Sequence, residues 1–389
     1  MVLDKRHKVL ALASVVLFID MIGYGIVIPI LPLYASTLGA TTTKIGFLFA
    51  SYSFVFLFAL LPLCHVVDNY GKKKPIILGM LLLGISSLFY AFSTSLFLLT
   101  TSRMLQGFSA SLTWAAALPL ASQVTTKDRR GLEMSIISIA IGLGSILGPV
   151  IGGLGSFHTP FYFLALVTFC LGFLCLFWLE EPEEVKKHRE YTKLKEKIIR
   201  LLQVKEVQCS CLGVVFCWFF WGMLEVLFPL YLQAGSYPRF VIGILFGVSG
   251  IAFVLFQPVA GIFSDRVGRM LPILLGLLFL ALLAPIPFHL MTLSYLLGAM
   301  AFLGLVSAFI YAPTLSLIGD AVPEEDQGIA YGLNTWMFSV SYIVGPWLAG
   351  ILADAFSLQA PFYVCSVVMI IGSVIVFKIA KKIKQQGRT

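Results

Sequence analysis

Long apolar runs recur from one end of the chain to the other and are separated by short polar segments. Each run is close to or longer than the roughly 20 residues that a helix needs to cross the hydrocarbon core of a bilayer. Because that core offers the backbone no hydrogen-bond partners, the runs are predicted to be α-helices. We expect twelve spans, over residues 9–34, 44–67, 74–94, 96–124, 131–155, 160–180, 209–233, 239–264, 270–290, 292–320, 328–353 and 359–380.

Composition and charge placement agree with a membrane protein. Charged residues make up 12% of the 389 residues, about half of the roughly 25% that soluble domains carry. All but Lys44, Arg103 and Arg239 of the 27 lysines and arginines lie in the termini or in alternate loops. Because basic loops stay in the cytoplasm, both termini are predicted to be cytoplasmic. The net charge of +8 is therefore assigned to membrane orientation, and we expect no nucleic-acid partner.

The two halves of the sequence repeat each other at an offset of 197 residues. The string Pro-Leu-Tyr at 32–34 returns at 229–231, and the Gly-Pro pair at 148–149 returns at 345–346. We therefore expect an all-α membrane protein with two pseudo-symmetric six-helix bundles, each formed by one half of the chain. The predicted parts are an N-terminal bundle over 1–180, a cytoplasmic linker over 181–208 and a C-terminal bundle over 209–389. Parallel six-span repeats hold a binding site at their interface, which indicates transport.

A short loop motif follows the eighth predicted span, where the chain reads GIFSDRVGR over 261–269. Gly268 is expected to allow a tight reversal, and Gly261 a close approach of helices. Asp265 can pair with Arg266, Arg269 or the positive end of a helix. These residues predict a latch at the cytoplasmic end of the helices.

A second copy of the motif follows the second span, where Asp68 and Gly71 match Asp265 and Gly268 in the repeat. The later copy resembles the loop that members of the major facilitator superfamily carry after spans two and eight. The resemblance implies the major facilitator fold and a latch for the outward-facing state. The first copy departs from the family pattern, with Cys64 in place of glycine and Asn69 in place of arginine.

Two further elements extend the resemblance. Arg103 and Gln106 match the R-x-x-Q-G element of the family's fourth span, and an arginine so deep in a span needs a partner. The fifth span resembles the motif of proton-coupled antiporters and is expected to bend, although packing of helices alone would also explain its glycines. The expected hinge residues are Gly144, Gly148, Pro149 and Gly152.

Only two acidic residues lie deep in a predicted span, Asp20 and Glu225. A carboxylate at such a depth costs at least about 2.5 kcal/mol, so it usually lines a wet cavity or pairs with a cation. The strings around both acids resemble the first and seventh spans of vesicular amine transporters and bacterial drug:proton antiporters. The resemblance implies that these acids bind the ammonium group of a solute or exchange protons. Further cavity-lining candidates are Tyr24, Gln106, Trp221 and Trp336.

These features lead us to expect proton-coupled antiport, with export of an organic cation, amine or amphipathic drug by alternating access. Asp20, Glu225 and Arg103 would bind the solute and couple protons. The alternative is proton-coupled transport of a neutral or anionic metabolite such as a sugar, with Arg103 as the ligand. No catalytic or metal motif is visible, so we expect no enzyme, metal or cofactor and a proton gradient as the energy source. A monomer in a bacterial cytoplasmic membrane is expected.

Overall fold

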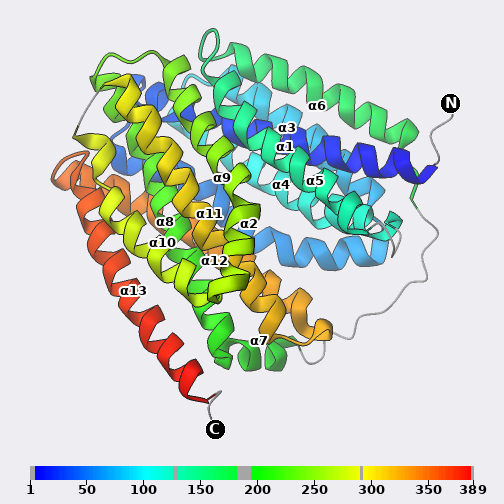
Figure 1. Cartoon of the computed structure of the whole chain (residues 1–389). Helices are drawn as coiled ribbons and strands as arrows, with labels where there is room; N and C mark the ends of the chain where they lie inside the picture. The colour runs from blue at the N-terminus through cyan, green and yellow to red at the C-terminus, as the bar shows by residue number, and fades with distance from the viewer. Residues whose placement is uncertain (1–4, 126–129, 182–193, 290–291, 387–389) are drawn as a thin grey trace. The chain divides into compact units, whose positions relative to one another are not determined.

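The computed structural model describes residues 5–125, 130–181, 194–289 and 292–386, which are helical almost throughout and contain no strand (Figure 1). The chain divides into two compact units, which are treated separately below. Unit 1 comprises Met1–Lys187 and Ser236–Gly247, and unit 2 comprises His188–Gly235 and Val248–Thr389.

Unit 1 contains six complete helices, and the start of a seventh, α9, packs with them. The first helix packs along the fifth and fourth, and the third packs against the fourth and sixth. The six helices are α1 (Lys5–Thr37), α2 (Thr42–Tyr70), α3 (Lys73–Ala91), α4 (Leu96–Val124), α5 (Arg130–Gly152) and α6 (Thr159–Trp178).

Unit 2 repeats this arrangement after a short additional helix, α7. Here α8 packs along α12 and α11, and α10 packs against α11 and α13. Its elements are α7 (Leu194–Gln203), α8 (Lys205–Ala234), most of α9 (Arg239–Val267), α10 (Met270–Leu283), the 3-10 turn η2 (Ile286–Phe288), α11 (Leu293–Ala321), α12 (Glu324–Ala355) and α13 (Ala360–Gln386).

The repeat extends to individual backbone contacts between helices. A methyl group added at Gly148 would lie 2.9 Å from the carbonyl oxygen of Ile22, and one added at Gly345 would lie 2.7 Å from that of Phe219. Both members of this second pair stand 197 residues after their counterparts. The two units therefore use the same close helix crossing, which confirms that they have the same internal architecture.

Eleven helices in the described part of the chain are long and apolar enough to span a membrane. The predicted span that is not among those eleven is the fourth, α4. Its 29 residues are long enough to cross a membrane. It carries several buried polar side chains, including Ser102, Arg103 and Gln106. These face neighbouring helices of unit 1, so the lower hydropathy of α4 is consistent with a span surrounded by protein.

The predicted linker differs from the structure in two ways. Residues 194–203 form the amphipathic helix α7, and α8 starts at Lys205 instead of residue 209. The apolar stretch marks only the hydrocarbon-buried part of a helix, whereas Lys, Glu and Gln readily continue it beyond that region. For the same reason, α12 begins at Glu324 instead of residue 328.

Candidate functional site

The first deep acid, Asp20, lies on α1 and is 3% exposed. It accepts a 2.9 Å hydrogen bond from Nε1 of Trp114 and a 3.3 Å bond from Oγ1 of Thr113, both on α4. Among the described residues, no lysine or arginine forms an ion pair with Asp20. Neutral donors therefore hold the carboxyl group in the described part of the structure.

The deep arginine, Arg103, lies one helical turn from Gln106 and is 1% exposed. Its Nη1 donates to Oε1 of Gln106 at 2.9 Å, and Tyr90 donates to the same oxygen at 3.0 Å. Nε2 of Gln106 donates to the carbonyl oxygen of Gly23 at 2.9 Å. The R-x-x-Q element thus ties α4 to α1 and α3.

Three aromatic rings cover the guanidinium group of Arg103. Its Cζ lies 4.5 Å from the ring centre of Tyr52 and 5.1 Å from those of Tyr24 and Phe49. Cation–π contacts of this kind are strongest where water is excluded. The structure therefore brings three predicted residues together, Arg103, Gln106 and Tyr24. The expected need of Arg103 for a partner is met here by Gln106 and the rings, and its role in binding or coupling stays a prediction.

The second deep acid, Glu225, lies on α8 of unit 2 and is 5% exposed. The hydroxyl of Tyr342 on α12 donates to its Oε1 at 2.9 Å. One turn earlier on α8, Trp221 donates from Nε1 to Oγ of Ser307 at 2.9 Å. Trp336 is 38% exposed on α12. Whether Trp221 and Trp336 line a cavity stays a prediction.

Tyr342 and Thr113 were not among the predicted site residues. A signal for Tyr342 exists in the repeat, because it stands about one turn before the Gly-Pro pair at 345–346. The Gly-Pro pair lies in α12, which packs on α8, the first span of the second half. A polar residue one turn from such a crossing is placed to reach an acid on the neighbouring span.

The glycines of the predicted fifth-span hinge pack directly against the backbone of α1. Methyl groups added at Gly144, Gly148 and Gly152 would come closest to Phe18 O, Gly25 Cα and Ile26 O, respectively. Pro149 lies at the same crossing, with its Cδ 2.6 Å from a methyl built on Gly25. These positions show a packing role, and the hinge stays a prediction.

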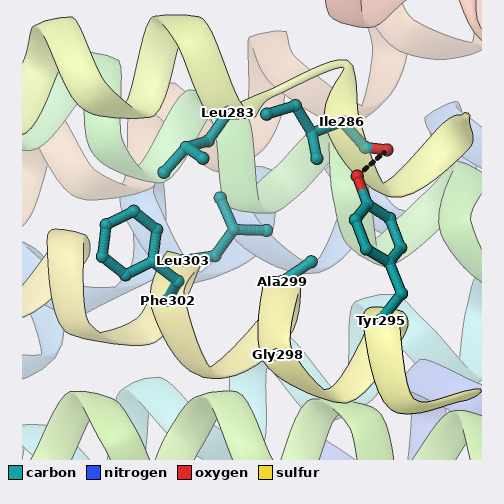
Figure 2. Close-up of a pocket in the computed structure, with 7 residues that line it drawn as sticks. All are labelled: Leu283, Ile286, Tyr295, Gly298, Ala299, Phe302 and Leu303. Carbon is teal, nitrogen blue, oxygen red and sulfur yellow. Dashed lines mark hydrogen bonds between the residues drawn. The ribbon is translucent and has the colours of Figure 1, made fainter.

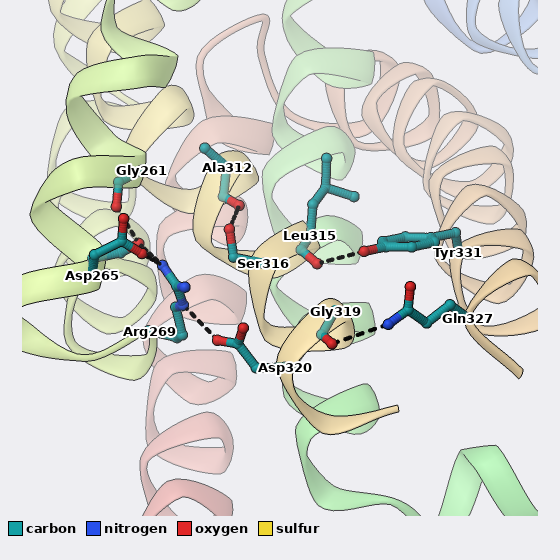
Figure 3. A network of polar contacts seen from close by, with 11 residues as sticks. Gly261, Asp265, Arg269, Ala312, Leu315, Ser316, Gly319, Asp320, Gln327 and Tyr331 are labelled. Atoms are coloured by element: carbon teal, nitrogen blue, oxygen red, sulfur yellow. Dashed lines mark hydrogen bonds and ion pairs between the residues drawn. The ribbon is translucent and has the colours of Figure 1, made fainter. Parts of the chain in front are cut away.

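The second latch motif forms an ionic network in unit 2 (Figure 3). Arg269 pairs with Asp265, donates from Nε to Asp320 at 2.8 Å and from Nη1 to Ser264 Oγ at 2.8 Å. Gly268 has a φ of 88°, a conformation that glycine adopts without the Cβ penalty of other residues. The two carboxylates hold the pKa of Arg269 above its usual range. The motif therefore fastens the α9–α10 turn to the end of α11.

Within unit 2, the surroundings of Gly261 and Arg266 differ from those that the motif predicts. A methyl added at Gly261 would meet no atom within 4 Å, so no close contact is seen within its unit and the expected close approach of helices stays a prediction. The Gly261 carbonyl accepts a 2.8 Å bond from Ser264. Arg266 lies exposed at the end of α9.

Polar contacts continue from the latch to the linker helix. Gln327, in the first turn of α12, donates to the carbonyl oxygens of Gly319 and Val322 at the end of α11 (Figure 3). The preceding residue, Asp326, forms salt bridges with Lys197 at 2.7 Å and Arg200 at 2.6 Å, both on α7. Polar contacts therefore join α7, α12 and the end of α11 in the same unit that holds the latch.

The first latch motif is built differently. Gly71 has a φ of 95°, and the Glu181 carboxylate accepts a hydrogen bond from the backbone N–H of Lys72. A methyl on Gly71 would lie 2.7 Å from both Glu181 carboxylate oxygens. The carboxylate therefore lies at the start of α3, where the helix dipole favours a negative charge. The side chain of Asp68 lies outside the described part of the structure.

An apolar cavity of about 340 Å³ opens between α10, η2 and α11 (Figure 2). At its rim, Tyr295 donates to the carbonyl oxygen of Ile286 at 3.3 Å. None of the predicted site residues lines this cavity, so we do not assign it to the site. Within the described residues, no group of three or more His, Cys, Asp or Glu side chains could hold a metal.

Known structures share this fold over almost the whole chain. A bacterial homolog of the human lysosomal transporter Spinster, in an inward-facing and unoccupied conformation, has a TM-score of 0.85 at 13% identity, covering 98% of both chains. The nucleoside transporter NupG has a TM-score of 0.80 at 15% identity, covering 96% of this chain and 99% of its own.

Sequence comparisons are more specific. Multidrug resistance protein 2 of Bacillus subtilis is 27% identical, covering 92% of this chain and 91% of its own. The quinolone resistance protein NorA of Staphylococcus aureus is 25% identical, covering 95% and 97%. The family model described as Major Facilitator Superfamily matches residues 13–238 and 210–387. The chain is a multi-pass membrane transporter and belongs to the Major Facilitator Superfamily.

Proposed function

We propose that this transporter exports an organic cation or amphipathic drug in exchange for protons. The observation that carries the proposal is the environment of Asp20, a buried carboxyl held by neutral donors from Thr113 and Trp114. Burial without a fixed cation makes the charged carboxylate costly on its own. A cationic solute or a proton relieves that cost, and both cannot do so at once. Competition for one carboxyl is a simple means of coupling the two flows.

Glu225 extends the same logic to unit 2, where Tyr342 donates to its carboxylate. The names of the relatives from Bacillus subtilis and Staphylococcus aureus, which refer to multidrug and quinolone resistance, support export of drug-like solutes. The alternative ligand for an anionic or neutral metabolite is Arg103, which is covered by aromatic rings and 1% exposed. The rings already offset the charge of the guanidinium, whereas Asp20 forms no ion pair with a described lysine or arginine, and this difference favours the cation proposal.

Further parts of the proposal follow from charge placement and from the relatives. Both termini lie in the cytoplasm, because the basic residues gather on that side. The protein works as a monomer in a bacterial cytoplasmic membrane. A proton gradient supplies the energy, and no cofactor takes part.

Transport by Asp20→Asn tests the proposal. Purified protein is reconstituted into liposomes with an imposed pH gradient, and uptake of a fluorescent organic cation is followed. The asparagine keeps the size and can accept the bond from Thr113 or from Trp114 through its single amide oxygen, but it carries no charge and cannot be deprotonated. We expect gradient-driven accumulation to be abolished. Thr113→Val, which removes only the weaker donor, serves as the control and should retain it. Unchanged accumulation by Asp20→Asn would refute the role given to this carboxyl.

A further inference from the structure

Trp218 stands at the centre of an aromatic cluster in unit 2. Its ring centre lies 5.9 Å from Phe253 on α9, 5.8 Å from Tyr311 on α11, and 5.0 Å and 6.0 Å from Phe338 and Tyr342 on α12. Three of the contacts are edge-to-face and the fourth, with Tyr342, is tilted. Four helices thus each contribute at least one ring to the same place. All of the rings except that of Tyr342 remain partly exposed.

The indole N–H of Trp218 is buried and has no hydrogen-bond partner among the described residues. Two other tryptophans of the chain are satisfied, since Trp114 donates to Asp20 and Trp221 donates to Ser307, each at 2.9 Å. A buried donor without an acceptor is costly and rare in native proteins. An acceptor from outside the chain would remove that cost.

The cluster lies beside the acid of the same unit. Trp218 precedes Glu225 by seven residues, which places them on one face of α8 and roughly 10 Å apart along its axis. Tyr342 connects the two places, because its hydroxyl donates to Glu225 and its ring packs against Trp218. A solute that reaches Glu225 with its cationic group can therefore extend along α8 to the indole.

Three aromatic rings of unit 1 have a different role. There the rings of Tyr24, Phe49 and Tyr52 already cover the guanidinium of Arg103. In the described part of unit 2, no lysine or arginine lies over the ring of Trp218. The partly exposed ring of Trp218 is therefore not covered by a cation of the described part of unit 2, whereas the rings of Tyr24, Phe49 and Tyr52 lie over Arg103.

We infer that Trp218 forms a subsite for the planar aromatic part of the transported cation and donates its indole N–H to an acceptor oxygen on that ring. The inference rests on the proposed export of organic cations and narrows the class of solute. The preferred solute carries an amine and, roughly 10 Å away, a flat ring system with a carbonyl-type oxygen. Glu225 takes the amine and Trp218 takes the ring and its oxygen.

Two amines that differ in one oxygen test the inference. A fluorenone and a fluorene with the same dimethylaminoethoxy group are both flat, but only the ketone carries a ring acceptor. Their affinities for the full-length protein in lipid nanodiscs are measured by isothermal titration calorimetry. We expect the wild type to bind the ketone about tenfold more tightly, because the fluorene leaves the buried N–H unpaired. Trp218→Phe, which keeps a ring but lacks the N–H, should abolish this preference.

Trp347→Phe is the matched control, since this tryptophan of α12 is 48% exposed and is not assigned to the site, and it should keep the tenfold preference. If Trp218→Phe does not fold, Phe338→Leu tests the ring contacts and should weaken both amines equally. Equal binding of both amines by the wild type, or a preference that persists in Trp218→Phe, overturns the Trp218 subsite and leaves cation export standing. Failure to bind either amine counts against both proposals, while equal loss of both in Glu225→Gln supports the cation site.

Discussion

Replacing Gly148 by alanine is expected to separate α1 from α5. The added methyl would lie 2.8 Å from Cα of Gly25 and 2.9 Å from the carbonyl oxygen of Ile22. Non-bonded carbons are at their optimum about 3.5–4.0 Å apart, so the two backbones must move apart by roughly 0.7 Å or more. Both neighbours are backbone atoms, and no side chain can rotate away to make room.

The expected loss of stability is the balance of two terms. Overpacking of a close contact costs about 1–3 kcal/mol, and the upper end applies where the backbone must shift. Alanine regains about 1 kcal/mol over glycine inside a helix. The net effect is a loss of about 2 kcal/mol, which lowers the melting temperature by about 2–3 °C for a chain of 389 residues.

Thermal unfolding in detergent, followed by intrinsic fluorescence, measures this shift. Gly332→Ala is the matched control, because a methyl on Gly332 of α12 would meet no atom within 4 Å. This variant should raise the melting temperature slightly, since alanine is favoured over glycine in a helix. Transport by both variants is measured in parallel. A hinge role alone predicts slower transport by Gly148→Ala without lower stability. Gly148→Ala that melts as high as Gly332→Ala would refute the packing argument.

Two further predictions concern the latches. Gly71→Ala and Gly268→Ala both place an alanine at positive φ, at a cost of about 1–2 kcal/mol, but only Gly71→Ala also meets the Glu181 carboxylate. Gly71→Ala should therefore melt lower, and equal melting temperatures would argue against that contact. Arg269→Lys keeps the charge but loses the fork that reaches Asp320, so stability should fall by under about 1 kcal/mol at these exposed sites. The deficit should shrink at high salt, and a salt-independent deficit would argue against an ionic cause.

The architecture could be predicted from the sequence because membrane spans and a duplicated order leave strong signals. Each apolar run corresponds to a helix, except that the run over 270–290 is divided into α10 and the 3-10 turn η2. The offset of 197 residues aligns helix crossings such as Gly148 with Gly345. The helix α7 escaped prediction, because its ten residues are amphipathic and lie within a charged linker. Neither length nor hydropathy separates such a helix from a loop.

The site could be predicted only in part. The deep placement of Asp20 and Glu225 follows from one-dimensional position in an apolar run, and both are buried in the structure. Their hydrogen-bond partners depend on how neighbouring helices rotate about their axes, which spacing along one helix does not determine. Arg103 shows the same limit. The sequence indicates that it needs a partner but not which one, and in the structure it bonds Gln106 and lies over aromatic rings.

The polar character of α4 has a consequence for how the protein is made. A helix that carries a buried arginine two turns inside one end, as α4 does with Arg103, enters a bilayer poorly alone, at a cost of up to about 2.5–3.5 kcal/mol for that residue. The helices that α4 contacts most, α1, α2 and α3, all precede it in the chain. They are already synthesised when α4 leaves the ribosome, so its insertion can be driven by association with them. Biogenesis of the first unit is therefore expected to be sequential, with α4 entering the lipid as part of an assembling group.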